Sequence, residues 1–209
     1  MNLRAVAIGG ASNPNTLIVG DGGTAVTLPA AGPPLVKHVS GTVANLYAIA
    51  QNPNLTRDDL LIGGAPIVTK AVAASWDSNN TFNPQMTGMV GITGNIYALL
   101  CGTGTFYAAG DMGAIVSRTS GGGAPGGANK WATETSTVNT TLRAMWATAE
   151  NNIYAVGDGG TIIQYNGNSW AKVAITPPPP AISLRAIWGS SATNIYVVGD
   201  SGYVLHYLP

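Results

Sequence analysis

Five copies of one short pattern run along the chain, and this repetition limits the fold more than any other feature. Each copy opens with an apolar, strand-like phrase, clearest at Leu142–Trp146 and Leu184–Trp188. The copies begin near residues 3, 46, 96, 142 and 184, at intervals of 43, 50, 46 and 42 residues. A repeat of this length is a small unit that must stack on its neighbours to bury its apolar faces. We therefore expect one domain over residues 1–209.

Each unit reads as three clear strands and a weaker fourth. The strand-like runs are rich in β-branched and aromatic residues and are bounded by Gly, Asn and Asp. Four units carry Gly-Asp-x-Gly between the second and third strands, which predicts a hairpin turn whose Asp bonds to the backbone. Unit two departs from this pattern with Gly63–Pro66, and we expect its later strands at Asp59–Gly63, Ile67–Val72 and, as a poor match, Met86–Ile92.

Four antiparallel strands in 42–50 residues are typical of a β-propeller blade. The sequence predicts an all-β, five-bladed β-propeller of four-stranded antiparallel blades, with the first strand of each unit innermost. We expect a three-stranded last blade, because unit five reaches Pro209 directly after its third strand. One small residue recurs in every inner strand, and we expect it to surround a narrow central channel: Ala5, Ala48, Ala98, Ala144 and Ala186.

The phrases Leu184–Ser191 and Asn194–Gly202 resemble the repeat of bacterial surface and secreted β-propellers. They are also similar to repeats of photosystem II assembly-factor propellers and, more distantly, to Asp-box propellers. The resemblance is strong over residues 142–209, moderate over 1–30 and 96–118, and weak over 46–72. It implies a propeller scaffold and says little about activity, because the matching positions are scaffold positions: Trp170, Leu184, Trp188, Tyr196, Gly199 and Gly202.

Composition excludes several classes of function. Only 9% of the residues are charged, the net charge is zero, and the basic residues are scattered, so we expect no nucleic-acid partner. No apolar run approaches the ~20 residues of a membrane span, so we expect no membrane insertion. The lone Cys101 cannot form a disulfide within the chain, and we interpret it as a small buried apolar residue. No spacing of His, Cys or acidic residues indicates a metal or a cofactor.

The second position of the inner strands holds the most suggestive set of side chains. It is Arg in three units and Tyr in two, so five side chains could meet at one mouth of the propeller: Arg4, Tyr47, Tyr97, Arg143 and Arg185. They could pack on neighbouring blades with their polar ends in solvent, or they could bind an anionic ligand. We predict no catalytic residues, because no acid or base accompanies this position.

Trp76 is a second candidate for ligand contact. It lies beside Asp77 in a loop-like stretch, where an exposed aromatic could contact a glycan or a protein. Alternatively, it is the displaced counterpart of Trp131 and Trp170, which recur at the start of the fourth strand and indicate blade packing.

The third strand of the last unit is a candidate assembly edge. If the last blade lacks a fourth strand, this strand keeps unpaired backbone groups on one side, and such an edge can pair with another chain. The residues concerned are Tyr203, Val204, Leu205, His206 and Tyr207.

These features favour a non-catalytic interaction or assembly module. The most specific hypothesis is that the protein is a structural or adhesive subunit of a larger surface assembly, such as a virion, a tail or a cell-surface appendage. Its partners would be other protein subunits, including copies of itself, and an extracellular, cell-surface or virion location is favoured over the cytoplasm. A glycan-binding lectin is the alternative, and the resemblance implies an assembly chaperone as a further one.

Overall fold

The computed structural model describes residues 2–7, 16–29, 31–32, 34–38, 40, 42–51, 60–67, 70–76, 82–84, 93–102, 104–119 and 131–208. These residues form five antiparallel sheets, four with four strands and one with three. The predicted all-β fold of propeller blades, with a three-stranded last blade, is confirmed.

The strands follow one another within each blade from the inside outward. Blade 1 contains β1 (Leu3–Ala7), β2 (Thr16–Gly20), β3 (Ala25–Leu28) and β4 (Val36–His38). Blade 2 contains β5 (Leu46–Gln51), β6 (Leu60–Ile67), β7 (Lys70–Trp76) and β8 (Phe82–Pro84). Blade 3 contains β9 (Ile96–Cys101), β10 (Thr105–Gly110), β11 (Ile115–Thr119) and β12 (Ala132–Glu134). Blade 4 contains β13 (Leu142–Ala149), β14 (Asn152–Gly157), β15 (Ile162–Tyr165) and β16 (Trp170–Lys172). Blade 5 contains β17 (Leu184–Ser191), β18 (Asn194–Gly199) and β19 (Val204–Tyr207).

Blade 2 differs from the sequence prediction. The second strand, β6, continues through the Gly63–Pro66 segment with a shift in register, and β7 begins at Lys70 rather than Ile67. The physical reason is the missing Asp, because the other four units close a tight turn at this point. The fourth strand is Phe82–Pro84, whereas Asp59 and Met86–Ile92 lie outside the described residues.

The Gly-Asp-x-Gly segments form the expected turns between second and third strands. Each contains a single turn of 3₁₀ helix: η1 (Asp21–Gly23), η2 (Asp111–Gly113), η3 (Asp158–Gly160) and η4 (Asp200–Gly202). The last glycine has a positive φ in all four, for example 69° at Gly113 and 73° at Gly202, a conformation that glycine adopts without steric cost. The turns therefore hold each Asp at the same end of its blade.

Consecutive blades pack face to face through apolar side chains. Between blades 3 and 4, for instance, Ala98, Tyr107 and Ile115 pack with Leu142 and Ile153. Burial of apolar surface between blades is the main favourable contribution to stability in such an array.

Three inner-strand alanines, Ala5, Ala98 and Ala144, pack in these interfaces and not around a central channel as predicted. Ala186, on the last blade, is exposed. Ala5 packs in the cluster of Leu46, and Ala144 packs in the cluster of Leu184. A register shift separates the leucine position from the alanine position, as between Leu142 and Ala144, and such a bulge re-aims the side chains that follow it. The leucine therefore faces the preceding blade, and the small alanine leaves room for the leucine of the following one.

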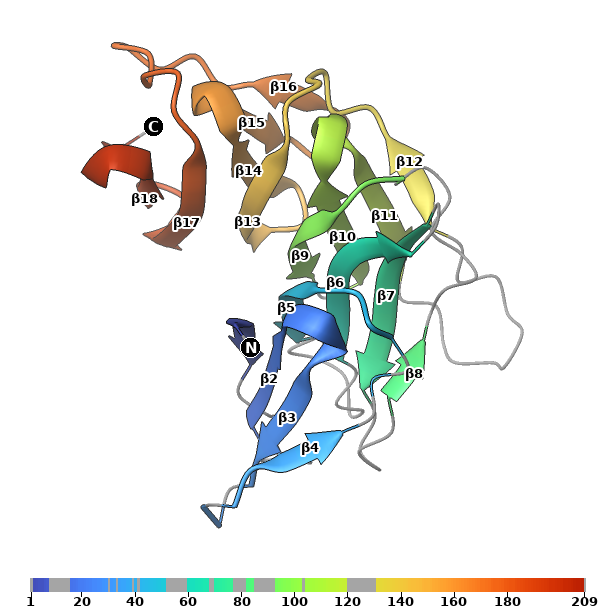
Figure 1. The fold of residues 1–209 in the computed structure, drawn as a ribbon. Coiled ribbons are helices and arrows are strands. Elements are labelled where there is room, and N and C mark those ends of the chain that lie inside the picture. The colour runs from blue at the N-terminus through green and yellow to red at the C-terminus, as the bar shows by residue number, and fades with distance from the viewer. Residues whose placement is uncertain are drawn as a thin grey trace.

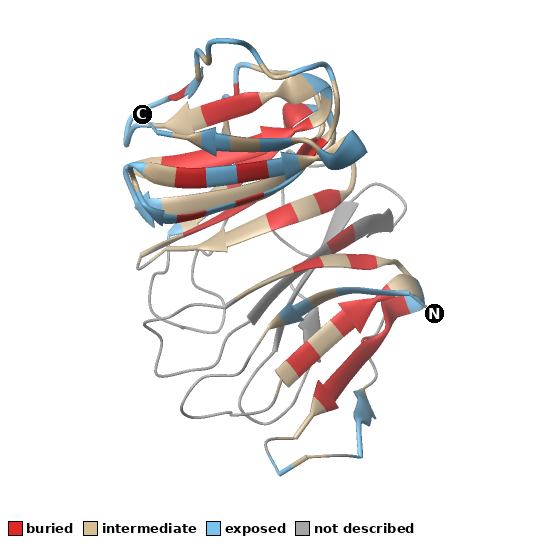
Figure 2. Ribbon diagram, turned by 90° about the vertical axis from the view of Figure 1, so that its left-hand side faces the viewer, coloured by how far each residue is buried: buried red, intermediate tan, exposed pale blue. Residues whose placement is uncertain are grey.

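The five blades form an arc. β1 packs beside β5, β5 beside β9, β9 beside β13 and β13 beside β17, whereas blade 1 and blade 5 stand at opposite ends (Figure 1). Every apolar cluster among the described residues joins neighbouring blades or lies within one blade. Figure 2 views the arc from the side on which both ends lie, and both carry exposed residues there.

Cys101 ends β9 and packs against a cluster that contains Ile96 and Phe106. Burial raises the pKa of this thiol to about 12. We expect alkylation of the native protein by iodoacetamide near pH 8 to be at least ~100-fold slower than alkylation of a free thiol, because the thiolate is the reactive form. Mass spectrometry of the modified chain checks this, with the urea-unfolded protein as the control. Equal rates in both states would show that Cys101 is accessible.

Candidate functional site

The second residues of the inner strands lie at one mouth of the arc, and four of the five contact one another in sequence. The guanidinium of Arg4 lies 5.8 Å from the ring centre of Tyr47, and the ring centres of Tyr47 and Tyr97 are 5.1 Å apart. The guanidinium of Arg143 lies 5.3 Å from the ring centre of Tyr97. We call Arg4, Tyr47, Tyr97, Arg143 and Arg185 the Arg–Tyr row. Cation–π contacts and tilted ring packing therefore link four of the five predicted residues directly.

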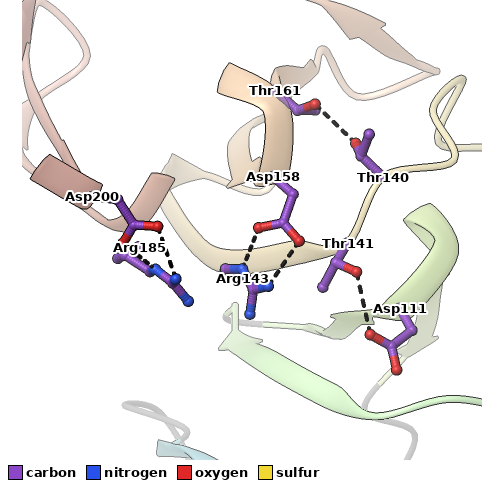
Figure 3. A network of polar contacts seen from close by, with 8 residues as sticks. All are labelled: Asp111, Thr140, Thr141, Arg143, Asp158, Thr161, Arg185 and Asp200. Carbon is purple, nitrogen blue, oxygen red and sulfur yellow. Dashed lines mark hydrogen bonds and ion pairs between the residues drawn. The ribbon is translucent and has the colours of Figure 1, made fainter. Parts of the chain in front are cut away.

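Each arginine of the row is held by the turn aspartate of its own blade through two parallel hydrogen bonds. The Nε and Nη2 atoms of Arg143 donate to Asp158 over 2.5 and 2.7 Å (Figure 3). Arg185 donates in the same way to Asp200 over 2.8 and 2.9 Å. The third pair repeats this geometry: Arg4 and Asp21, at 2.8 and 3.1 Å. Paired contacts of this kind fix the plane of the guanidinium as well as its position.

Blade 3 replaces the arginine by Tyr97, and its turn aspartate finds other donors. Asn95 donates to Asp111 from its backbone N–H and its side-chain amide, over 2.9 and 2.7 Å. The hydroxyl of Thr141, from the start of blade 4, donates to the other oxygen over 3.3 Å (Figure 3). In blade 2, which lacks the aspartate, the Asn45 amide donates to the Tyr47 hydroxyl over 3.3 Å. One hydrogen bond between blades, from Thr141 to Asp111, and local hydrogen bonds from Asn45 and Asn95 thus order the surroundings of the two tyrosines.

The mouth is close to electrically balanced. Three arginines of the row face four turn aspartates, so the site is not a cationic funnel. The guanidinium partner lowers the pKa of Asp21, Asp158 and Asp200 below the ordinary carboxylate value, mainly through the side-chain hydrogen bond. The same contacts raise the pKa of Arg4 and Arg185. The row therefore presents fixed donors and ring faces instead of free positive charge.

The pairing of Arg143 with Asp158 predicts a pH dependence of stability. Because the folded-state pKa of Asp158 is lowered, the pair stabilises the fold above the ordinary carboxylate pKa of about 4. That contribution is lost as the pH falls through the lowered pKa. We expect the Tm to drop between about pH 4 and pH 2, and the drop to be smaller in Asp158→Asn. Calorimetry across this range checks it, with Arg143→Gln as a second variant that should flatten the same window. Unchanged slopes in both variants would contradict the assignment.

The aspartate partners were missed by sequence reasoning, which interpreted them as turn residues only. A signal was present, because the three units with Arg in the inner strand also carry the turn Asp 15–17 residues later. The turn role and the pairing role coexist, since the backbone of the turn accepts and donates its own hydrogen bonds. For example, the N–H of Ala114 donates to the backbone oxygen of Asp111 over 3.1 Å.

The tryptophan positions divide into three kinds. Trp131 and Trp170 are buried in blade packing, as predicted, while Trp188 on the last blade is exposed. Trp76 is not in a loop as expected, because it ends β7 and pairs with Leu60 and Phe82 in the sheet. The side chain of Trp76 lies outside what the structure describes, so its role as a ligand contact stays a prediction.

The predicted assembly edge is the outer strand of blade 5. β19 pairs with β18 on one side, and it is the last strand of its sheet among the described residues. Leu205 and Tyr207 pack toward blade 4, whereas Val204 and His206 are exposed. The strand thus offers an open backbone edge and a partly apolar outer face.

The described part of the chain lacks two common functional features, a cluster of metal ligands and a membrane-spanning helix. No cluster of three or more His, Cys, Asp or Glu residues there could hold a metal ion. The same residues include no helix with the length and apolar character needed to cross a bilayer.

Comparison with known proteins shows the fold alone. No family model matches the chain, and no curated protein matches it in sequence. Many solved structures are similar in fold, and two of them are of YCF48. A structure described as YCF48 bound to D1 peptide has a TM-score of 0.68 and 12% identity, over 96% of this chain and 63% of that one. YCF48 from Cyanidioschyzon merolae has a TM-score of 0.71 and 11% identity, over 100% of this chain and 70% of that one.

The similar structures agree with the resemblance to assembly-factor propellers and give no support to the surface or Asp-box relationship. This chain spans 63% of the length of the peptide-bound structure. The similarity therefore shows a β-propeller fold, and one of the similar structures is bound to a D1 peptide.

Proposed function

We propose that this chain is a non-catalytic protein-binding module whose Arg–Tyr row recognises a segment of a partner protein. The observation that carries the proposal is the row itself, in which arginine and tyrosine side chains from four blades contact one another at one mouth. Tyr and Arg are enriched at the energetic centres of protein interfaces. The peptide-bound propeller of the same fold supports a peptide as the ligand class.

The geometry suits recognition of carbonyl or carboxylate groups on a peptide. Asp158 accepts hydrogen bonds from Nε and Nη2 of Arg143. The Nη1 group therefore lies on the opposite side of the guanidinium from that contact. A peptide oxygen can accept from Nη1, while the rings of Tyr47 and Tyr97 offer apolar faces beside it. Because the aspartates already fix the guanidinium planes, little side-chain entropy is lost on binding.

For the wider role, we propose a subunit of a larger surface assembly, outside the cytoplasm, with proteins as partners. The support is the small share of charged residues, 9% of the chain, which leaves a largely neutral surface for contact with other subunits. The assembly-chaperone alternative has equal support from the fold. Glycan binding gains no support from the repeated tryptophans Trp131 and Trp170, because both are buried in the blades.

The test is selection of peptides from a random displayed library on the 209-residue protein, followed by affinity measurement of single selected peptides. We expect Tyr97→Ala and Arg143→Gln to weaken binding at least ~10-fold, as for central interface residues. Lys172→Ala, an exposed change on β16, is the matched control and should leave the affinity unchanged. Circular dichroism confirms that each variant is folded. Selected peptides that bind all three variants equally would place the binding site elsewhere.

A further inference from the structure

The outer face of blade 5 is apolar and open. It carries Trp188, Tyr196, Val198 and Val204, and we call these four residues the end face. Val198 is 41% exposed and Val204 is 64% exposed. The equivalent residues of blade 4, Val156 and Ile162, are 0% and 7% exposed because blade 5 covers them. The same kind of surface is thus buried inside the arc and bare at its end.

The opposite end of the arc shows the complementary face. Leu3 and Val6 of β1 form what we call the front face, and they are 54% and 63% exposed. Their equivalents in later blades face the preceding blade, and the leucine position is fully buried in all four: Leu46, Ile96, Leu142 and Leu184. The exposure of Leu3 is therefore a property of its position at the end of the arc and not of its residue type.

The end face and the front face are the two halves of one kind of interface. Between blades 4 and 5, Leu184 and Ile187 of one blade pack on Val156 and Ile162 of the other. The arc thus ends on one side with the receiving half and on the other with the inserted half. An exposed apolar surface of this kind on a soluble protein marks a place where something else packs.

Smaller details of blade 5 match an internal blade. In blade 4 the side chain of Gln164 donates to Asn152 over 2.7 Å and to the Tyr154 hydroxyl over 3.0 Å. In blade 5 His206 takes the place of Gln164, contacts Asn194 over 2.7 Å and stacks on Tyr196 with ring centres 4.2 Å apart. The end face therefore has a side-chain arrangement similar to that of the equivalent face of blade 4, which blade 5 covers.

The similar structures indicate how many further blades would close the arc into a ring. All of this chain covers 70% of the propeller from Cyanidioschyzon merolae, so the uncovered part is roughly 90 residues, or two units of this repeat length. A second five-bladed copy is too large for a space of two blades. Two further blades of the same repeat would fit this space. Their apolar surfaces would also match the end face and the front face.

We propose that two further propeller blades of this repeat class, supplied by sequence outside these 209 residues, close the ring by packing on the end face and on the front face. The first of them places its inner-strand leucine on Val198 and Val204. The second presents its small inner-strand residue to Leu3. The fourth strand of blade 5 comes with them and pairs with β19.

The test adds such blades to the chain and measures whether both faces become covered. A copy of residues 166–183 is joined after Tyr207 to complete blade 5, and two copies of residues 142–183 follow it. Val198→Cys and Leu3→Cys, each in a Cys101→Ala background, report accessibility through the rate of maleimide labelling. Lys172→Cys, exposed on β16, is the control site.

We expect labelling at both faces to slow at least 10-fold in the extended protein, with no change at Lys172→Cys and a higher Tm. An extension with only one added blade should protect Val198→Cys and leave Leu3→Cys accessible. Leu142→Asp in the first added copy should abolish the protection. If the extended chain does not fold, the same two blades placed before Asn2 provide the second arm.

Two results would overturn the proposal. One is a dimeric mass for the unextended chain in light scattering together with slow labelling at Val198→Cys and Leu3→Cys, which would assign both faces to a second copy. The other is rapid labelling at both faces in both extended proteins. Neither result bears on peptide binding at the Arg–Tyr row, so the two proposals can fail independently.

Discussion

Leu142→Ala should destabilise the protein by about 2–5 kcal/mol, whereas Leu3→Ala should cost less than about 1 kcal/mol. The two residues hold the same position in their repeats, but Leu142 is fully buried against blade 3 and Leu3 is half exposed. Removing a buried leucine loses its transfer free energy and leaves a cavity. Removing an exposed leucine has little of either effect. The same Leu→Ala change is therefore expected to lower the free energy of unfolding by different amounts at the two sites.

Urea unfolding followed by tryptophan fluorescence measures both free energies in one background. Leu184→Ala serves as a further internal site, since Leu184 is also fully buried, and it should resemble Leu142→Ala. A cost for Leu3→Ala as large as that for Leu142→Ala would show that something already covers the front face in the isolated chain.

The regular blades could be predicted from the sequence because several independent sequence signals agree in them. In blades 4 and 5, strand-forming runs, Gly-Asp-x-Gly turns and the repeat spacing all indicate the same boundaries. The observed β14 and β18 accordingly end at Gly157 and Gly199, immediately before the turn aspartates. In blade 2 the turn signal is absent, so the pattern could not indicate where β6 ends.

The direction of the inner-strand alanines could not be predicted, because it depends on a bulge. Simple alternation places Leu142 and Ala144 on the same side of the strand. The register shift between them sends them to opposite blades, and no residue in Leu142–Trp146 marks that shift. The Arg–Tyr row was found from the repeat alone, since identical positions in stacked units lie at the same height.

The number of repeats likewise does not predict that the five blades form an open arc. Five units can form a closed five-bladed ring or five blades of a larger one, and the choice depends on the small rotation between neighbours. That rotation is set by the sizes of many side chains at each interface, such as Tyr107 and Ile115 against Leu142. Leu3 has the same residue type as Leu142, so only the structure shows that its neighbour is absent from the described arc.

Gly113→Ala should destabilise the protein by about 3 kcal/mol or more, and Gly202→Ala by about 1 kcal/mol. Both glycines close a Gly-Asp-x-Gly turn with nearly the same positive φ, 69° and 73°, so both variants carry the same backbone strain. They differ in what a methyl group would meet. At Gly113 it would lie 2.1 Å from the backbone oxygen of Val138, whereas at Gly202 nothing lies within 4 Å.

The difference arises from the segment that leads to the next blade. The Val138 carbonyl is held in place by the hydroxyl of Ser136, which donates to it over 3.1 Å, so it cannot move away cheaply. Gly23 should behave like Gly113, because a methyl group there would meet the backbone oxygen of Thr42 at a comparable approach. Urea unfolding of the three variants measures the costs. If Gly202→Ala were as destabilising as the other two, strain at positive φ alone would explain the glycine, and close passage of the linker would not be the reason for it.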